Sequence, residues 1–190
     1  MKKIILVHGW GGDSSDEGWF GYLRKELEEK GFEVKAWDMP NTNYPRIGEW
    51  VNFLKEKLPN PDKDTYFIGH SIGCQTIMRY LEALDENKEV GGCVFVAGWF
   101  NLLEETYEND EEREIAKPWI EKKINYEKVK SHTNNFTAIF SDNDPFVPLV
   151  DIDLFKERLG AKTILESDKG HFDNSEYPVI LNEILKITDK

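Results

Sequence analysis

Short runs of hydrophobic residues alternate with longer amphipathic stretches along the whole chain. The short runs predict buried strands at residues 3–8, 32–38, 65–69, 90–97, 135–140 and 162–166. The longer stretches predict helices at residues 19–30, 46–58, 73–84, 149–159 and 178–187. Strands that are apolar on both faces and alternate with helices are typical of a parallel sheet covered on both sides. We therefore expect an α/β fold, a three-layer α/β/α sandwich with a mostly parallel sheet of about six strands.

The alternation is broken once, between residues 101 and 130. This segment carries a run of acidic side chains followed by Pro118-Trp119-Ile120. Charge runs usually lie on solvated faces, which favours a simple amphipathic helical excursion. The alternative is a small helical lid, because loops at the carboxyl edge of such a sheet build the binding crevice. No repeat or low-complexity linker divides the chain, so residues 1–190 are expected to form one domain.

The charge of the chain narrows the classes of partner. Its 24 Lys and Arg residues are outnumbered by 36 Asp and Glu, which gives a formal net charge of -12. Nucleic acids and anionic lipid surfaces both require clustered cations, so we expect neither as a partner. Cys74 and Cys93 fall within a predicted buried helix and strand, which indicates reduced core thiols. The apolar runs are too short for a signal peptide or a membrane span, and we expect a cytoplasmic protein.

The strongest chemical signal is Gly69-His70-Ser71-Ile72-Gly73, which joins a predicted strand to a predicted helix. This context is that of the nucleophile elbow, where a serine in a strained conformation presents its hydroxyl at the edge of the sheet. A Cβ at either glycine would collide with neighbouring elements in so tight a turn. The Ile72 amide, at the start of the helix, would face the same space as one donor of an oxyanion hole. A chance occurrence of the motif is the competing interpretation, and the strand-to-helix context argues against it.

A nucleophilic serine needs a base, and the chain has four histidines. His8 ends the first predicted strand, His70 lies inside the motif, and His132 lies in a polar stretch before the fifth strand. His171 follows the sixth strand, from which a loop can return over the serine, and it satisfies the chain order serine, acid, histidine. We predict His171 as the base; the alternative is an ordinary histidine of a surface loop.

The third member of a triad accepts a hydrogen bond from the imidazole. Asp142 and Asp144 both follow the fifth predicted strand. Asp144 is preferred because it lies deeper in the turn, where Pro145 fixes the backbone. Asp142 stays the second candidate. Asp173 is a weaker substitute, because its position two residues after His171 makes the two side chains diverge.

A glycine-rich loop follows the first predicted strand, at Gly9-Trp10-Gly11-Gly12. It lets the main chain approach a substrate, and the Trp10 amide is the natural second donor of the oxyanion hole. The spacing does not fit the dinucleotide fingerprint Gly-x-Gly-x-x-Gly. A nucleotide-binding domain with the same strand and helix alternation is therefore not favoured.

Several aromatic residues sit just beyond predicted strand ends. They are candidates for a small acyl pocket, and the alternative is that they cap the hydrophobic core. These candidates are Trp99, Phe100, Phe146 and Phe172, together with Trp10 of the glycine-rich loop.

With these motifs in place, the sequence resembles the α/β-hydrolase superfamily over nearly its whole length. More narrowly it resembles the small serine hydrolases related to retinoblastoma-binding protein 9. The matching segments are 4–9, 69–74, 141–148 and 170–172. The resemblance implies a compact fold that lacks the first strands of larger relatives, the triad Ser71, Asp144 and His171, and substrates with carboxylic ester or peptide-like bonds. Because no large insertion follows the fourth strand, in contrast to lid-bearing lipases, long-chain lipids are not favoured.

The sequence thus predicts a serine hydrolase that acts on a small acyl substrate and needs neither a metal nor an organic cofactor. The alternative is a catalytically silent protein that keeps the hydrolase scaffold as a binding module, since a fold alone does not guarantee activity.

Overall fold

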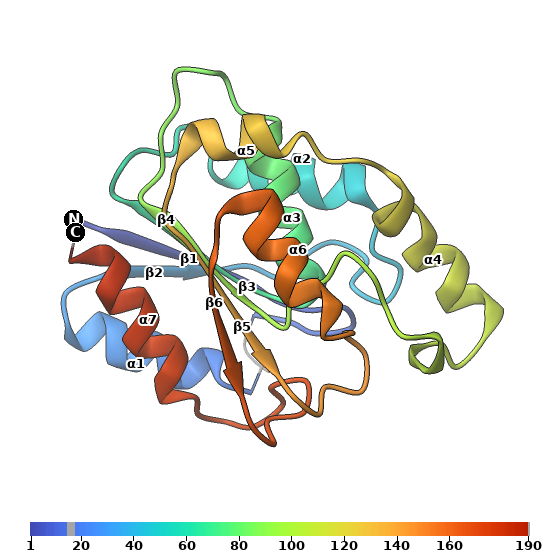
Figure 1. The fold of residues 1–190 in the computed structure, drawn as a ribbon. Coiled ribbons are helices and arrows are strands. Elements are labelled where there is room, and N and C mark those ends of the chain that lie inside the picture. Colours follow the sequence, from blue (N-terminus) through green and yellow to red (C-terminus); the bar gives the residue numbers. More distant parts are fainter. Residues whose placement is uncertain (15–17, 190) are drawn as a thin grey trace.

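A parallel sheet forms the centre of the computed structural model, which describes residues 1–14 and 18–189 (Figure 1). Within these residues the sheet has six strands in the order β2-β1-β3-β4-β5-β6, and every neighbouring pair is parallel. The strands are β1 (Lys3–Val7), β2 (Glu33–Ala36), β3 (Thr65–His70), β4 (Gly92–Val96), β5 (Phe136–Ser141) and β6 (Lys162–Glu166). The predicted fold class is therefore confirmed.

Helices cover both faces of this sheet (Figure 1). They are α1 (Phe20–Glu29), α2 (Ile47–Lys57), α3 (Ile72–Glu82), α4 (Asp110–Glu121), α5 (Tyr126–His132), α6 (Val150–Leu159) and α7 (Pro178–Thr188), with a short 3-10 turn at Glu104–Thr106. Helices α1 and α7 lie on one face, and α2, α3, α5 and α6 lie on the other. Among the described residues, no helix combines the length and the apolar character that crossing a membrane requires.

The two-residue period of the strands divides the core into two clusters. In β1, Ile4 and Leu6 pack towards α1 and α7, whereas Ile5 and Val7 pack towards α2 and α3. All four side chains are at most 1% exposed, which explains why β1 reads as an unbroken apolar run.

Both cysteines are free and buried, as expected. Burial raises the pKa of the Cys74 and Cys93 thiols, because a thiolate would be desolvated there. They are inert core groups.

The acidic segment between β4 and β5 is helical and is anchored at the carboxyl end of α4. Trp119 is 1% exposed, and its indole Nε1 donates a hydrogen bond to the Pro45 carbonyl oxygen at 3.0 Å. Its ring also meets the edge of Trp50, with centroids 6.0 Å apart. The carboxyl end of α4 is therefore tied to the segment that leads into α2.

Candidate active site

Ser71 occupies the sharp turn between β3 and α3. Its backbone is left-handed, with φ 52° and ψ -121°, and its amide donates a hydrogen bond to the Val96 carbonyl oxygen at 2.9 Å. A Cβ on Gly73 would lie 2.3 Å from the Val7 carbonyl oxygen, and one on Gly69 would lie 2.8 Å from the Cys74 amide nitrogen. Both glycines are therefore required by close packing, and the turn has the backbone expected of a nucleophile elbow.

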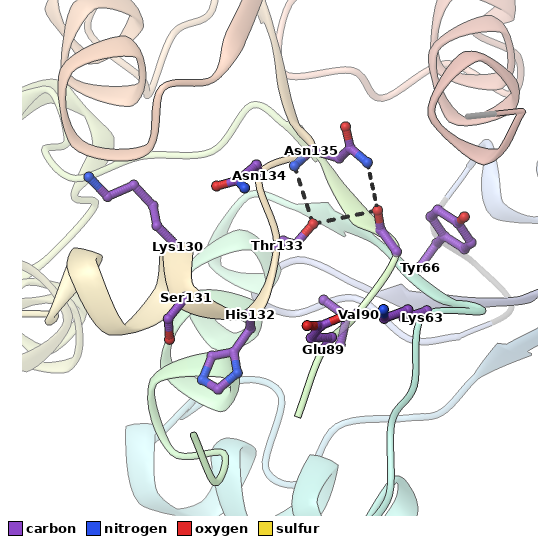
Figure 2. A pocket seen from close by; sticks show the side chains of 11 residues that line it. Lys63, Tyr66, Glu89, Val90, Lys130, Ser131, His132, Thr133, Asn134 and Asn135 are labelled. Atoms are coloured by element: carbon purple, nitrogen blue, oxygen red, sulfur yellow. Dashed lines mark hydrogen bonds and ion pairs between the residues drawn. The ribbon is translucent and has the colours of Figure 1, made fainter. Parts of the chain in front are cut away.

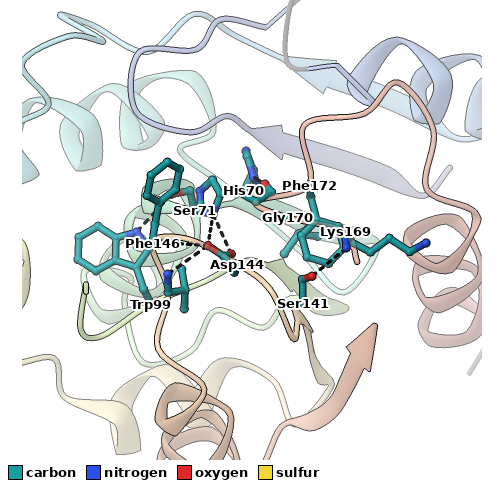
Figure 3. A network of polar contacts seen from close by, with 12 residues as sticks. His70, Ser71, Trp99, Ser141, Asp144, Phe146, Lys169, Gly170 and Phe172 are labelled. Atoms are coloured by element: carbon teal, nitrogen blue, oxygen red, sulfur yellow. Dashed lines mark hydrogen bonds and ion pairs between the residues drawn. The ribbon is translucent and has the colours of Figure 1, made fainter. Parts of the chain in front are cut away.

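The hydroxyl of Ser71 is contacted by an indole that follows β4. Trp99 Nε1 donates to Ser71 Oγ at 3.3 Å (Figure 3). The Trp99 carbonyl oxygen in turn accepts a hydrogen bond from Gln75 Nε2 at 3.1 Å, which fixes the residue against α3. Because the indole can only donate, the Ser71 hydroxyl keeps its own proton for another acceptor.

His171 and Asp144 form a hydrogen-bonded pair beside this turn. The imidazole Nδ1 lies 2.9 Å from Asp144 Oδ2 and 3.1 Å from Oδ1, and the two side chains are 10% and 2% exposed. Asp144 Oδ1 also accepts the amides of Phe146 at 2.9 Å and Val147 at 3.1 Å, so the carboxylate is held from both sides. With Nδ1 donating to the carboxylate, Nε2 is the basic nitrogen of the neutral ring.

The loop that carries His171 is tied to the elbow by His70. His70 Nε2 donates to the His171 carbonyl oxygen at 2.8 Å, and the two ring centroids lie 4.9 Å apart. Burial, reinforced by the nearby His171, lowers the pKa of His70 to about 3, so its ring is neutral. The sequence singles out His70 only as a competing base, whereas the structure gives it a positioning role.

The same loop is tied to the end of β5 by a polar clamp. The Gly170 amide donates to Asn143 Oδ1 at 2.8 Å, and the Lys169 amide donates to Ser141 Oγ at 3.0 Å (Figure 3). The loop also depends on left-handed backbone, with φ 57° at Asp168 and φ 62° at Phe172. The clamp residues were not predicted as site residues, because their role depends on a contact between two loops that are distant in the sequence.

The other candidate acids are placed elsewhere. Asp142 is exposed, and its Oδ1 accepts the Asp168 amide at 2.9 Å. That hydrogen bond is the main cause that lowers the Asp142 pKa. Asp173 is also exposed. Of the candidate acids, Asp144 is the one that the structure joins to His171.

The remaining two histidines, His8 and His132, contact main-chain groups. His8 accepts the Met39 amide at Nε2 (2.9 Å) and contacts the Gly9 carbonyl oxygen through Nδ1 (2.8 Å), and burial lowers its pKa. His132 itself lines a cavity of about 400 Å³, together with residues at the start of β3 and just before β4 and β5 (Figure 2). That cavity is at the amino edge of the sheet, opposite the edge that carries Ser71.

The two backbone donors predicted for an oxyanion hole lie where β1 and α3 meet. Trp10 follows β1, Ile72 begins α3, and the tight approach of Gly73 to the end of β1 joins these two segments. Within residues 1–14 and 18–189, neither the Trp10 amide nor the Ile72 amide donates a hydrogen bond. The Trp10 indole is held by the Asn43 carbonyl oxygen at 3.0 Å.

Besides Trp10, the predicted pocket aromatics separate into two pairs. Trp99 contacts Ser71, and the Phe146 ring meets the edge of the His171 ring with centroids 4.9 Å apart. Phe100 and Phe172 instead pack in the core: the Phe100 ring lies 4.5 Å from that of Phe155, and the Phe172 ring lies 5.0 Å from that of Tyr177. Both side chains are buried, at 6% and 1% exposure, so the alternative interpretation as caps of the hydrophobic core describes this pair.

Comparison with known proteins agrees with this geometry. Residues 4–180 match the family model described as serine hydrolase. The chain is 30% identical over 184 residues to the serine hydrolase RBBP9 of Rattus norvegicus, which covers 96% of this chain and 93% of the relative. It is 27% identical over 175 residues to the putative hydrolase YdeN of Bacillus subtilis, covering 92% and 88% of the two chains.

Solved structures show the same fold. The crystal structure of the ydeN gene product from B. subtilis superposes with a TM-score of 0.89 at 23% identity, with 100% of both chains covered. The monoacylglycerol lipase of Paleococcus ferrophilus superposes with a TM-score of 0.68 at 17% identity, covering 98% of this chain and 94% of that one. A compact α/β-hydrolase fold with a serine at its elbow, matched by the family model over most of its length, shows that this chain belongs to the serine hydrolase family.

Proposed function

We propose that this protein cleaves carboxylic ester or peptide-like acyl bonds of small substrates through an acyl-enzyme on Ser71. The observation that carries the proposal is the hydrogen bond between His70, which precedes Ser71, and His171, which pairs with Asp144. His70 Nε2 donates to the His171 carbonyl oxygen at 2.8 Å, while His171 Nδ1 lies 2.9 Å from Asp144. Base, acid and elbow are thereby built as one unit.

The reaction follows from the tautomer that Asp144 imposes. Ser71 Oγ attacks the acyl carbon as His171 Nε2 takes the hydroxyl proton, and Asp144 stabilises the imidazolium that results. The leaving group departs with that proton and leaves the acyl group on Oγ. A water molecule, deprotonated by the same Nε2, then attacks the acyl carbon; the bond to Oγ breaks, Ser71 takes the proton back from Nε2, and the acid is released.

The oxyanion that forms in both steps needs donors with no other acceptor. We assign this role to the amides of Trp10 and Ile72, since neither donates elsewhere among the described residues. The amino end of α3 adds a partial positive charge at the same place.

The substrate is a small acyl compound in this proposal. Trp99 and Phe146 flank the two reacting side chains, and their rings would contact the acyl group. The solved structures of similar fold include a Pyrococcus furiosus esterase and a monoacylglycerol lipase, which supports an ester.

The test is hydrolysis of p-nitrophenyl acetate by the Ser71→Ala variant. Turnover should fall by about 10³-fold or more, because the nucleophile is lost while the fold is kept. The matched control is Ser131→Ala, which removes an exposed hydroxyl from α5 and should leave turnover unchanged.

A fluorophosphonate probe separates the enzyme from a silent binding module. The wild-type protein should be labelled on Ser71, and Ser71→Ala should not be labelled. Unlabelled wild-type protein at saturating probe, or unchanged turnover in Ser71→Ala, would favour the binding module.

A further inference from the structure

A second cavity lies behind the catalytic edge of the sheet, where α3, the end of α4, α5 and α6 meet. Its volume is about 450 Å³, and residues lining it include Gln75, Arg79, Phe100, Tyr126 and Arg158. None of the three predicted triad residues lines it. Gln75 lies on α3 about one helical turn after Ser71, which immediately precedes this helix, so the cavity is close to the active site and separate from it.

Arg79 is the buried cation of this cavity. The residue is 3% exposed, and its Nη2 donates to the Trp119 and Lys122 carbonyl oxygens at 2.9 and 2.8 Å. Nη2 and Nε also donate to Gln75 Oε1, at 3.0 and 3.3 Å. Through the bonds to Trp119 and Lys122, the Arg79 side chain caps the carboxyl end of α4.

One nitrogen of Arg79, Nη1, takes no part in this capping. Nη1 is buried and has no hydrogen-bond partner among the described residues. Burial lowers the pKa of Arg79, while the nearby Glu82 and Tyr126 act in the opposite direction. An unsatisfied N–H on a buried charge is costly, and an anion in the adjoining cavity would compensate that charge at close range.

A second guanidinium faces the same cavity from α6. Arg158 Nη1 donates to the Tyr126 hydroxyl oxygen at 3.0 Å, and Arg158 Cζ lies 4.5 Å from the centre of the Phe100 ring. Because the Tyr126 oxygen accepts this bond, its own proton is free to be donated. Arg158 still has N–H groups for a ligand, since a guanidinium carries five donors.

The charge around the cavity is opposite to that of the whole chain. Arg79, Arg158, Lys122 and Lys123 line it, against the single carboxylate of Glu121. The chain carries a formal net charge of -12, but screening limits that repulsion to about 8 Å at physiological salt. Contacts inside the cavity therefore decide which ion binds.

We propose that this cavity is a binding site for a phosphate group, either as inorganic phosphate or as a small phosphomonoester. The Arg158 guanidinium and the Tyr126 phenol offer hydrogen-bond donors, the buried Arg79 adds a second positive charge, and paired N–H donors of arginine match phosphate oxygens. The aromatic wall formed by Phe100 and Trp119 would contact the organic part of an ester.

The test is isothermal titration of the wild-type protein with inorganic phosphate and, separately, with phenyl phosphate, in chloride buffer at constant ionic strength. We expect saturable binding of one ligand per chain. Tighter binding of inorganic phosphate identifies a free-ion site, and tighter binding of phenyl phosphate identifies a phosphomonoester site.

Three variants locate the binding. Arg158→Gln and Tyr126→Phe should each weaken the affinity, Arg158→Gln by about tenfold or more. The matched control is Lys117→Gln, which removes an exposed cation of α4 that does not line the cavity and should change the affinity by less than about twofold. Tyr126→Phe removes only a hydroxyl, so it keeps the test informative if Arg158→Gln does not fold. The proposal is overturned if neither probe binds saturably to the wild-type protein, or if the affinity is unchanged in both cavity variants.

Discussion

The imidazole of His70 lies against the backbone of His171, with Nε2 2.8 Å from its carbonyl oxygen. The side chain next to the predicted nucleophile therefore holds the loop of the predicted base. The ring is buried and neutral, and its protonation would place a charge in the core beside His171, which makes this contact sensitive to acid.

Stability should fall in acid because of His70. Its folded-state pKa of about 3 lies below the ordinary value of 6.5. Between these values the unfolded chain binds a proton that the folded chain excludes, so this contribution is complete above pH 6.5 and is lost as the pH falls towards 3. The slope is up to about 1.4 kcal/mol per pH unit for one such group.

Urea unfolding at several pH values measures this slope, and His70→Gln should reduce it. Part of the slope should persist in the variant, because burial also lowers the pKa of His8. Equal slopes in wild type and His70→Gln would contradict the linkage.

Asp144→Asn should lower kcat for ester hydrolysis by about 10³- to 10⁴-fold, because an amide no longer imposes the tautomer with a basic Nε2. Asp142→Asn is the matched control. It makes the same change of a carboxylate to an amide in the same turn, but on a side chain that accepts the Asp168 amide and does not contact His171. Its kcat should stay within about tenfold of wild type. Similar losses in the two variants would mean that the acid has been assigned wrongly.

Trp99→Phe removes the indole donor on Ser71 Oγ and keeps an aromatic ring. One hydrogen bond of about 1 kcal/mol corresponds to a loss of about fivefold in kcat, because the hydroxyl is less well oriented. Trp119→Phe controls for the removal of a buried indole, since that donor bonds the Pro45 carbonyl oxygen. Kinetics on a small ester should show the loss in the first variant and not in the second.

Gly73→Ala should destabilise the fold by at least about 2 kcal/mol and abolish hydrolysis, because the new Cβ would lie 2.3 Å from the Val7 carbonyl oxygen. Gly48→Ala makes the same change in α2, where nothing lies within 4 Å of the new Cβ. It should stabilise the protein by about 0.5–1 kcal/mol through helix propensity. Denaturant midpoints distinguish the two, and equal midpoints would contradict the packing at the elbow.

Hydrophobic runs predicted the four central strands because β1, β3, β4 and β5 are buried on both faces, whereas the edge strands β2 and β6 are partly exposed. Residues 162–166 were predicted as a strand and form β6. Residues 32–38 were also predicted, yet β2 covers only Glu33–Ala36, because its single neighbour β1 pairs with those four residues. The sequence pattern indicates that a strand is present, but the length of an edge strand is set by how many of its residues pair with the neighbouring strand.

Ring direction could not be predicted for the residues after the strands. Phe146 and Phe172 look alike in the sequence, but Phe172 has φ 62° and is 1% exposed in the core, while Phe146 meets His171. The clamp formed by Ser141 and Asn143 was missed for a related reason: it consists of hydrogen bonds between two loops that no local pattern connects.

The left-handed backbone at Ser71, Asp168 and Phe172 has a thermodynamic consequence for how this protein can change. Each such residue costs of order 1–3 kcal/mol, so the loops that carry the hydroxyl and the imidazole oppose folding and are kept in shape by the sheet beneath them. Selection for heat resistance alone would relax these turns first. A variant stabilised by relaxing these turns should therefore have a lower kcat.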